Sequence, residues 1–390
     1  MAVIARRPRG LGVLQRERSL RPDLFIVIPY LLLSAFGVLM VYTASAPRLE
    51  ALGLDPSSEM TRQAAFVVAG SMVFVGASMV DTRALKMVSP WIYLGSVISL
   101  VIVLTAGTTV RSASRWIDVG PIRLQPSEFA KVAVILMLAV LLSVEKDEGP
   151  LHWSDVARSI AVVGLPAVLI FLQPDLGTML VFGFITIVML FIAGTTMRQL
   201  ATMAVGATFG AVALFQVGAI KEYQITRLTA FLDSTADTVS ANYNQLQSEI
   251  AIGSGGFLGK GLQNGTQTNL RFVPEQSTDF IFTAIGEQLG FIGGLIVLAL
   301  FLVLIWRMLV AAVAARDRFG QLLAGGVAAL LTFHVFVNVG MTVRLMPVTG
   351  LPLPLLSAGG SAFITMSLAF GLAHSVWMRR SPVPGERQIL

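Results

Sequence analysis

Four ionisable residues in or beside apolar segments are the first candidates for chemistry in this sequence. Glu128 and Lys131 stand three residues apart in the run QPSEFAK, so they share one face if that run is helical. Asp175 follows a proline between two apolar runs, and Asp279 stands just before a long one. Because charged groups are costly in an apolar layer, their presence there marks a candidate functional site.

The Asp279 carboxylate has more than one interpretation. It can act as a general base that removes the proton from a reacting hydroxyl, or it can cap the helix that the following apolar run predicts. Lys260 and Arg271 precede it in the same connection and can supply positive charge for an anionic substrate. A divalent cation, Mg²⁺ or Mn²⁺, bound by Asp279 is a further alternative, and the residues alone do not separate these roles.

The other candidates have structural interpretations too. Glu128 and Lys131 can form an ion pair at the start of a helix, and Asp175 can cap the helix that begins beside it. The glycine-rich run around Lys260, IGSGGFLGKG, resembles a phosphate loop superficially, but Ser254 stands where a Walker A motif requires glycine. Nucleotide binding is therefore rejected, which leaves an anion-binding turn or a linker.

The composition predicts a membrane protein. Of the 390 residues, 55% are hydrophobic and 13% are charged, whereas about 25% of residues are charged in soluble domains. There is no cysteine, which excludes disulfides, thiolate metal sites and a cysteine nucleophile, and the three histidines lack the spacing of metal ligands. The basic residues behind the net charge of +6 lie mainly between apolar runs, which indicates orientation in the membrane and not nucleic-acid binding.

The predicted fold is an all-α polytopic membrane protein with about ten transmembrane helices. The apolar runs cover residues 24–45, 63–80, 88–107, 128–144, 157–172, 176–195, 198–217, 281–309, 321–343 and 360–378. With the amino terminus in the cytoplasm, 17 of the 28 Lys and Arg residues fall on the inner side, as the positive-inside rule requires. Residues 1–23 and 379–390 are then cytoplasmic tails, and the helices fall into two groups, 24–217 and 281–378.

One connection, residues 218–280, is much longer than the others and lies on the outer side in this topology. Its hydrophobic residues predict that it folds against the membrane domain, because long structureless loops are uncommon. The segments with Glu128, Asp175 and Asp279 reach the same side. The sequence therefore predicts a site for an anionic substrate at the outer leaflet.

Several motifs together resemble the SEDS family of peptidoglycan glycan-strand polymerases. They lie in matching order within residues 24–378 and include Arg115-Trp116-Ile117, Gln125-Pro126-Ser127-Glu128 and the run PVTGLPLP from Pro347. The runs IAIGSGG from Ile250 and GTQ from Gly265 are similar to the family member that acts in cell elongation rather than in division.

The resemblance implies a reaction and the residues that perform it. Lipid II is polymerised at the outer face of the bacterial cytoplasmic membrane and undecaprenyl diphosphate is released, with Asp279 as the catalytic carboxylate and Glu128 and Lys131 in the same outer cavity. Fixed cations, Lys131 among them, can stabilise the charge on the departing diphosphate. The substrate-binding candidates are the polar residues of the outer segments, namely Arg115, Asp175, Lys260 and Arg271.

The chain departs from the family pattern at four positions, none of which removes a candidate charge. They are Ser277, Gln288, Leu355 and Ala362, where His, Glu, Phe and Ser are common. A lipid II flippase is the main alternative function, since charged residues and ten spans suit transport as well. The motifs gather on one side, however, whereas transporters place their sites near the midplane. A scaffold that recruits a synthase leaves Asp279 unexplained.

Small residues predict a packing surface. Gly290 and Gly294 form a GxxxG pair in the eighth apolar run, and Gly326 belongs to a group of small residues that begins the ninth. Such residues let helices approach closely, either within this protein or with a partner. The resemblance implies a class B penicillin-binding protein, a transpeptidase with one transmembrane helix. We expect that helix between the eighth and ninth runs, with the partner's stalk near Phe231–Tyr243 of the long loop.

Overall fold

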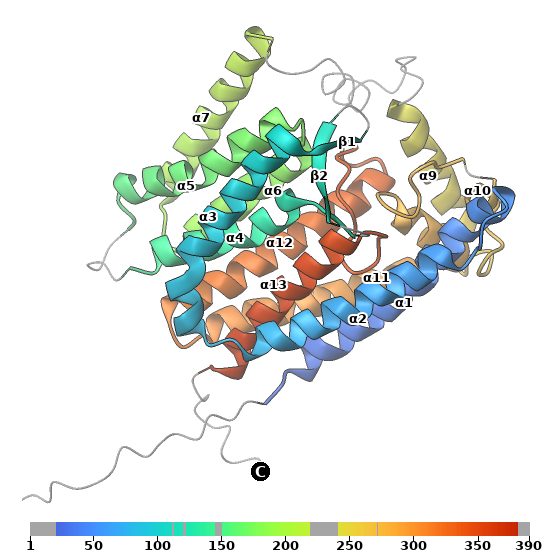
Figure 1. Ribbon diagram of the computed structural model, residues 1–390, viewed down its shortest axis with the longest axis horizontal. Helices are drawn as coiled ribbons and strands as arrows, with labels where there is room; N and C mark the ends of the chain where they lie inside the picture. Colours follow the sequence, from blue (N-terminus) through green and yellow to red (C-terminus); the bar gives the residue numbers. More distant parts are fainter. Residues whose placement is uncertain are drawn as a thin grey trace, which may run out of the picture.

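The structure, a computed structural model, describes residues 21–110, 113–119, 122–144, 150–218, 241–270 and 272–380. Its long helices lie side by side as a bundle, and short strands and two further helices cover one end of that bundle (Figure 1).

Each of the ten predicted transmembrane segments is a helix. They are α1 (Leu24–Ala51), α2 (Ser58–Met79), α3 (Thr82–Ala106), α4 (Pro126–Leu142), α5 (Trp153–Leu172), α6 (Leu176–Ile192), α7 (Met197–Gln216), α11 (Ile281–Val313), α12 (Arg318–Thr342) and α13 (Gly360–Met378). Within the described ranges, eight of them are long and apolar enough to cross a membrane, and α6 is a shorter apolar helix. The predicted all-α polytopic fold is confirmed.

α12 and α13 form the interior of the bundle. Of their most apolar stretches, 78% and 72% of the residues are buried, against 22% for α2 and α3 and 6% for α7. Figure 1 shows α7 standing away from the other helices. Large apolar side chains such as Met72, Trp91 and Phe209 are exposed on the outer helices. A hydrocarbon environment accepts such a surface, so polar groups that must be fixed in place belong on the inner helices.

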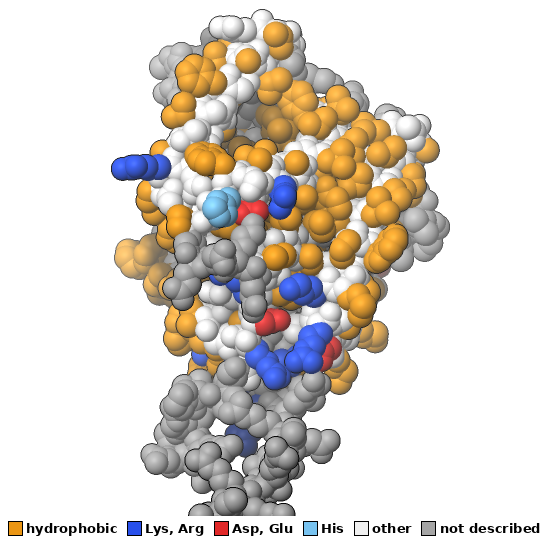
Figure 2. Space-filling model, turned by 90° about the vertical axis from the view of Figure 1, so that its left-hand side faces the viewer, with side chains coloured by type: hydrophobic (Ala, Val, Ile, Leu, Met, Phe, Trp, Pro, Cys, Tyr) orange, Lys and Arg blue, Asp and Glu red, His pale blue; other side chains and the backbone are white. Residues whose placement is uncertain are grey.

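The two ends of the bundle differ. The strands, α9, α10 and the turn between α1 and α2 lie at one end, here called the sheet end (Figure 1). At the other end, Arg307 donates to Asp23 Oδ2 through Nε and Nη2 (2.8 and 2.6 Å) and lies over the Trp377 ring. His374 Nε2 accepts from Asp23 N (2.9 Å). This network fastens α1, α11 and α13 together, and Figure 2 shows charged side chains among hydrophobic ones on a face of the molecule near this end.

The connection between α3 and α4 forms a small antiparallel sheet that the sequence analysis did not predict. β1 (Thr108–Val110), β2 (Ala113–Val119) and β3 (Ile122–Leu124) pair in that order. The Ser361 hydroxyl donates to Arg123 O (2.9 Å) and accepts from Gln125 N (3.1 Å). The sheet is thereby tied to the start of α13, and this tie fixes the point at which α4 begins.

Residues 241–270 of the long connection fold against the bundle, as predicted. They include α9 (Ala241–Gly255) and α10 (Thr266–Asn269). Gln245 Nε2 donates to Met346 O (2.7 Å), and the Ser248 hydroxyl donates to Thr342 O at the end of α12 (2.8 Å). Residues 219–240, which include the Phe231 side of the predicted partner contact, lie outside the described residues.

α11 is interrupted at Gly290, where φ is 66° and ψ is −162°, a conformation that only glycine adopts readily. Backbone groups released by the break pair with the glycine-rich segment: Phe291 N donates to Gly256 O (2.9 Å), and Lys260 N donates to Glu287 O (3.1 Å). The glycine-rich segment is therefore not a flexible linker, and the N–H groups of Gly259, Lys260 and Gly261 donate to backbone carbonyls. It satisfies the backbone of a broken helix, which a membrane environment requires.

The same break makes the predicted GxxxG docking pair wrong. Gly290 is not helical, and a Cβ atom there would collide with Gly259 N. Gly294 faces a side chain of its own helix, and a Cβ on Gly326 would collide with Ile135 of α4. These small residues serve packing within the protein, which was the alternative interpretation of the pattern.

Candidate active site

The predicted pair of Glu128 and Lys131 is present in the first turns of α4. Pro126 begins this helix with the fixed φ that suits a first helical position, and Glu128 follows in the first turn. Lys131 Nζ donates to Glu128 Oε1 (2.7 Å), and the two side chains are 0% and 3% exposed. No described residue bonds to Glu128 Oε2. The pair therefore lies inside the bundle, where its Lys131 ammonium is enclosed by protein.

Lys131 has a second partner that the sequence analysis missed, His334 of α12. Lys131 Nζ lies 3.2 Å from His334 Nε2, and His334 Nδ1 lies 3.2 Å from Pro352 O. An ammonium can only donate and a carbonyl can only accept, so the imidazole proton is assigned to Nδ1. Because 203 residues separate Lys131 from His334, no spacing in the sequence indicates this contact.

Asp279 lies at the sheet end, in a turn just before α11. Its N–H donates to Glu275 O (3.1 Å), and the N-cap of α11 is Phe280, so the helix-capping alternative for Asp279 is wrong. The Asp279 side chain is half-buried. A Cβ atom on Gly350 would lie 3.6 Å from Asp279 Oδ2. The carboxylate therefore borders the loop 343–359 and keeps access to the surface.

The turn that holds Asp279 is bonded to this loop through Asn338 of α12. The buried Asn338 amide donates from Nδ2 to Asp279 O (2.8 Å) and to Leu351 O (2.7 Å). Ala358 N donates to Ser277 O (2.8 Å). Segments that are far apart in sequence thus meet at two points, and Asn338 is a second residue that the sequence analysis missed.

Asp175 caps α6, as its structural interpretation predicts. Its Oδ1 accepts from Thr178 N (3.2 Å) and its Oδ2 from the Thr178 hydroxyl (3.0 Å), and its side chain is buried. A Cβ atom on Gly177 would lie 2.9 Å from Thr349 O, so the start of α6 lies against the loop that borders Asp279. Asp175 therefore supports the wall of the site, and its carboxylate oxygens are engaged in the cap.

Lys260 belongs to a separate cluster built around Glu287, a fully buried carboxylate of α11. Lys260 Nζ donates to Glu287 Oε1 (3.2 Å) and to the Thr266 hydroxyl (2.8 Å). Glu287 also accepts from Gln267 N (2.8 Å) and from Thr268 N (2.9 Å). The cluster fixes residues 260–268 beside the break in α11. Only the charge of Glu287 within an apolar run could have indicated it.

Two substrate-binding candidates lie at the edge of what the structure describes. Arg115 is on β2, with its side chain outside the described residues, and Arg271 lies outside them altogether. Among the described side chains, no group of three or more His, Asp or Glu is arranged to hold a metal ion. The cation alternative for Asp279 stays a prediction.

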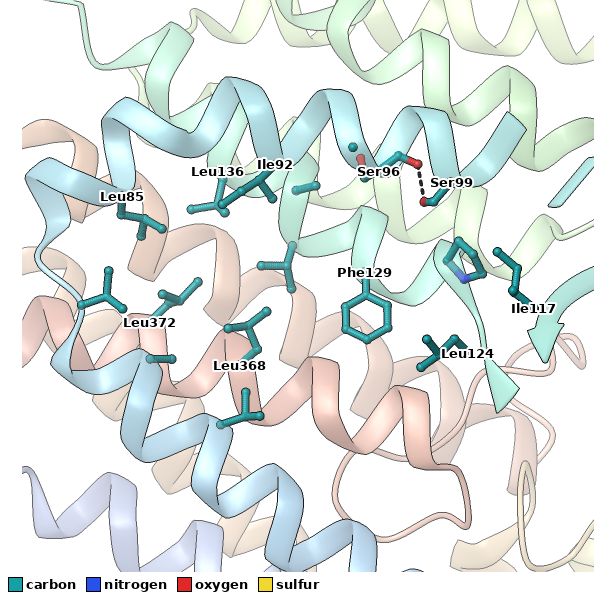
Figure 3. Close-up of a pocket in the computed structure, with 17 residues that line it drawn as sticks. Leu85, Ile92, Ser96, Ser99, Ile117, Leu124, Phe129, Leu136, Leu368 and Leu372 are labelled. Atoms are coloured by element: carbon teal, nitrogen blue, oxygen red, sulfur yellow. Dashed lines mark hydrogen bonds between the residues drawn. The ribbon is translucent and has the colours of Figure 1, made fainter. Parts of the chain in front are cut away.

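An apolar cavity of about 590 Å³ lies on the other side of α4 from Lys131. Figure 3 shows it between α2, α3, α4 and α13, with Phe129, Ile117 and Leu124 toward the strands and Leu85 and Leu372 toward the opposite end. Apart from Ser96 and Ser99, its lining side chains are non-polar. A cavity of this kind, inside a membrane bundle, suits a hydrocarbon chain.

A polytopic bundle with a half-buried carboxylate at one end and a buried ion pair in its interior is a membrane protein with a candidate site near one face. The chain belongs to the family of the cell cycle proteins FtsW, RodA and SpoVE, which it matches over residues 23–381. The resemblance found in the sequence is thereby confirmed.

Known relatives cover almost the whole chain. It is 36% identical to the peptidoglycan glycosyltransferase MrdB of Escherichia coli (strain K12), over 93% of this chain and 94% of that one. It is 33% identical to the peptidoglycan glycosyltransferase RodA of Treponema pallidum (strain Nichols), over 92% and 98% of the two chains.

Solved structures share the fold. One is described as a peptidoglycan synthase complex that coordinates polymerization and crosslinking, with a TM-score of 0.76 and 30% identity over 91% of this chain and 97% of that one. Another is the rod shape determining protein RodA of Thermus thermophilus, with a TM-score of 0.67 and 27% identity over 93% and 98%.

Proposed function

We propose that this protein is a peptidoglycan glycosyltransferase that polymerises lipid II at the outer face of the bacterial cytoplasmic membrane, for cell elongation and shape. Undecaprenyl diphosphate is the leaving group. The observation that carries the proposal is the half-buried Asp279 carboxylate, which borders Gly350 at the sheet end of a chain whose relatives are named peptidoglycan glycosyltransferases.

Asp279 is the general base of the proposed mechanism. A sugar hydroxyl is a weak nucleophile, so a carboxylate takes its proton as the hydroxyl oxygen attacks the sugar carbon bonded to diphosphate. That carbon–oxygen bond breaks, and negative charge gathers on the departing diphosphate, where fixed cations stabilise it. Arg115 and Arg271 are candidates for this role. Lys260 is held by Glu287, and Lys131 is held by Glu128 and His334. Both lysines therefore have a supporting role and do not contact the diphosphate.

The apolar cavity supports a lipid-linked substrate. The end of the cavity toward the strands is lined by Phe129, the residue after Glu128, and the cavity extends from there toward Leu85 and Leu372. A polyprenyl chain in this cavity would place its diphosphate near the strands and the start of α4. The reacting groups would then meet at the sheet end, which is the outer face in the proposed orientation, with residues 218–280 outside and both termini in the cytoplasm.

A class B penicillin-binding protein is the proposed partner, consistent with the structural likeness to a complex of polymerization and crosslinking. Its transmembrane helix would lie against the eighth and ninth spans. α12 is mostly buried, so most of the available surface is the exposed apolar side of α11, which includes Leu295, Leu302 and Trp306. The partner's stalk would meet residues 218–280. Cysteines placed at Leu295 and Leu302 should crosslink to the partner helix, and crosslinks confined to α2 or α5 would contradict this assignment.

The function is tested with purified protein and labelled lipid II in detergent. We expect glycan polymer from the parent protein and a loss of about 100-fold or more for Asp279→Asn, which keeps the shape and removes the base. The matched control is Asp55→Asn, an exposed carboxylate in the turn between α1 and α2 at the same end. An active Asp279→Asn variant would refute the base assignment. No polymer from the parent, with or without the transpeptidase, would overturn the function and favour transport of lipid II.

A further inference from the structure

Two buried polar side chains, His334 and Asn338, lie one helical turn apart on the same side of α12. They bond to the carbonyls of consecutive loop residues. Asn338 Nδ2 donates to Leu351 O (2.7 Å), and His334 Nδ1 lies 3.2 Å from Pro352 O. These carbonyls belong to the proline-rich loop after α12, and a buried non-helical backbone needs such partners.

Each of the two side chains also reaches a second part of the site. Asn338 Nδ2 donates to Asp279 O (2.8 Å), and His334 Nε2 accepts from Lys131 Nζ (3.2 Å). One side of α12 therefore connects three segments that are separate in the sequence: the turn before α11, the loop after α12 and the start of α4.

The position of the loop matters for the carboxylate because Gly350 borders it. Gly350 has a φ of 76°, and a Cβ atom on it would lie 3.6 Å from Asp279 Oδ2. The residue that follows, Leu351, is the one whose carbonyl Asn338 holds. Loss of that bond frees the loop to move relative to Asp279. A misplacement of about 1 Å at a reacting group can cost about 100-fold in rate.

We propose that His334 and Asn338 are positioning residues. Together they hold the Asp279 turn and the loop around Gly350 in one fixed arrangement, and they keep Lys131 at a fixed position relative to both. Neither side chain contacts substrate. This inference rests on the proposed polymerase function, and it assigns the arrangement of the site to α12, which carries none of the catalytic candidates.

The kinetic test uses Asn338→Leu, which is similar in size and removes both donated bonds. We expect the maximal rate of polymerisation to fall about 100-fold while KM for lipid II changes less than threefold, because the substrate contacts remain. The control is Thr332→Val on the same helix, whose hydroxyl has Ala328 O of its own helix as its one bonding partner among the described residues. It should keep the parental rate.

A second pair of variants separates positioning from simple packing at His334. Gln can donate to Pro352 O through its amide nitrogen and accept from Lys131 through its oxygen, whereas Leu can do neither. We expect His334→Gln to retain at least a tenth of the parental rate and His334→Leu to fall below a hundredth. Equal rates for the two variants would overturn the proposal for His334, and this comparison decides the matter if Asn338→Leu does not fold.

A structural readout keeps the test independent of activity. Since the chain has no cysteine, spin labels can be attached at Thr278→Cys and Thr349→Cys, the neighbours of Asp279 and Gly350. Dipolar broadening between the labels should be present in the otherwise parental protein and with Thr332→Val, and reduced with Asn338→Leu. Unchanged broadening together with an unchanged rate in Asn338→Leu would refute the proposal. A parent that makes no polymer but loses broadening in Asn338→Leu would instead refute only the proposed function.

Discussion

Replacing Lys131 by Met leaves the Glu128 carboxylate in buried surroundings without its counter-ion. The two charges are 2.7 Å apart and almost fully buried. At an effective dielectric constant of about 20, their attraction over that distance is roughly 6 kcal/mol. Removing the two ions from water costs several kcal/mol each, so the intact pair adds little net stability. The loss of one partner is destabilising, because the cost of burying the other charge remains.

We therefore expect Lys131→Met to lower the free energy of unfolding by about 3–5 kcal/mol. The double variant Glu128→Gln/Lys131→Met removes both charges and should recover most of that loss. Unfolding of the purified protein in detergent, measured for the parent, both single variants and the double variant, gives the coupling energy between the two residues. A Lys131→Met variant as stable as the parent, or a double variant no more stable than Lys131→Met, would refute the reasoning.

The same four proteins separate the two roles of the pair. If Glu128 and Lys131 are only a structural ion pair, the stable double variant should polymerise lipid II at close to the parental rate. If they take part in the site, the double variant should be folded and inactive. The second result is expected here, because Lys131 is one of the groups that His334 connects to the loop bordering Asp279.

Three further predictions concern the break in α11, the ion pair of Arg307 and Asp23, and the orientation in the membrane. Gly290→Ala should lower the free energy of unfolding by at least about 1–3 kcal/mol, because the backbone there suits only glycine, and a stability equal to the parent would contradict the break in α11. Arg307→Leu should lower the free energy of unfolding by about 3 kcal/mol, because it leaves the buried Asp23 carboxylate without its counter-ion. The double variant Arg307→Leu/Asp23→Asn should recover part of this loss, and equal losses for the single and double variants would argue against the ion pair. A membrane-impermeant maleimide should label Phe257→Cys in intact cells and Arg316→Cys only after permeabilisation, and the reverse pattern would invert the proposed orientation.

The helices could be predicted from the sequence because lipid leaves the backbone few choices. A chain in hydrocarbon must satisfy its own N–H and C=O groups, so apolar runs of about 20 residues become helices. The break at Gly290 could not be predicted, since the composition is apolar on both sides of it. Its partners come from the glycine-rich segment some 30 residues earlier, through bonds such as Phe291 N to Gly256 O. The sheet was missed because β1 and β3 have three residues each.

The site was partly predictable for a related reason. Charged residues within or beside apolar runs are visible in a sequence, and this signal indicated the candidates Glu128, Lys131 and Asp279. Their neutral partners give no such signal. His334 and Asn338 resemble isolated polar residues on an apolar helix until the fold places Lys131, Leu351 and Asp279 around them. Those contacts bridge elements that are far apart in the chain, so they depend on the packing of α4, α11 and α12.

Two departures from regular helix surround the candidate site. The break in α11 and the proline-rich loop after α12 both expose backbone groups that lipid cannot satisfy. The glycine-rich segment satisfies the first, and side chains of the buried helix α12 satisfy part of the second. The turn that carries Asp279 is bonded to this loop through Asn338, so the half-buried carboxylate has a defined place beside Gly350. The bonds that satisfy this irregular backbone therefore also fix the position of the Asp279 carboxylate, and that position depends on α12 remaining buried.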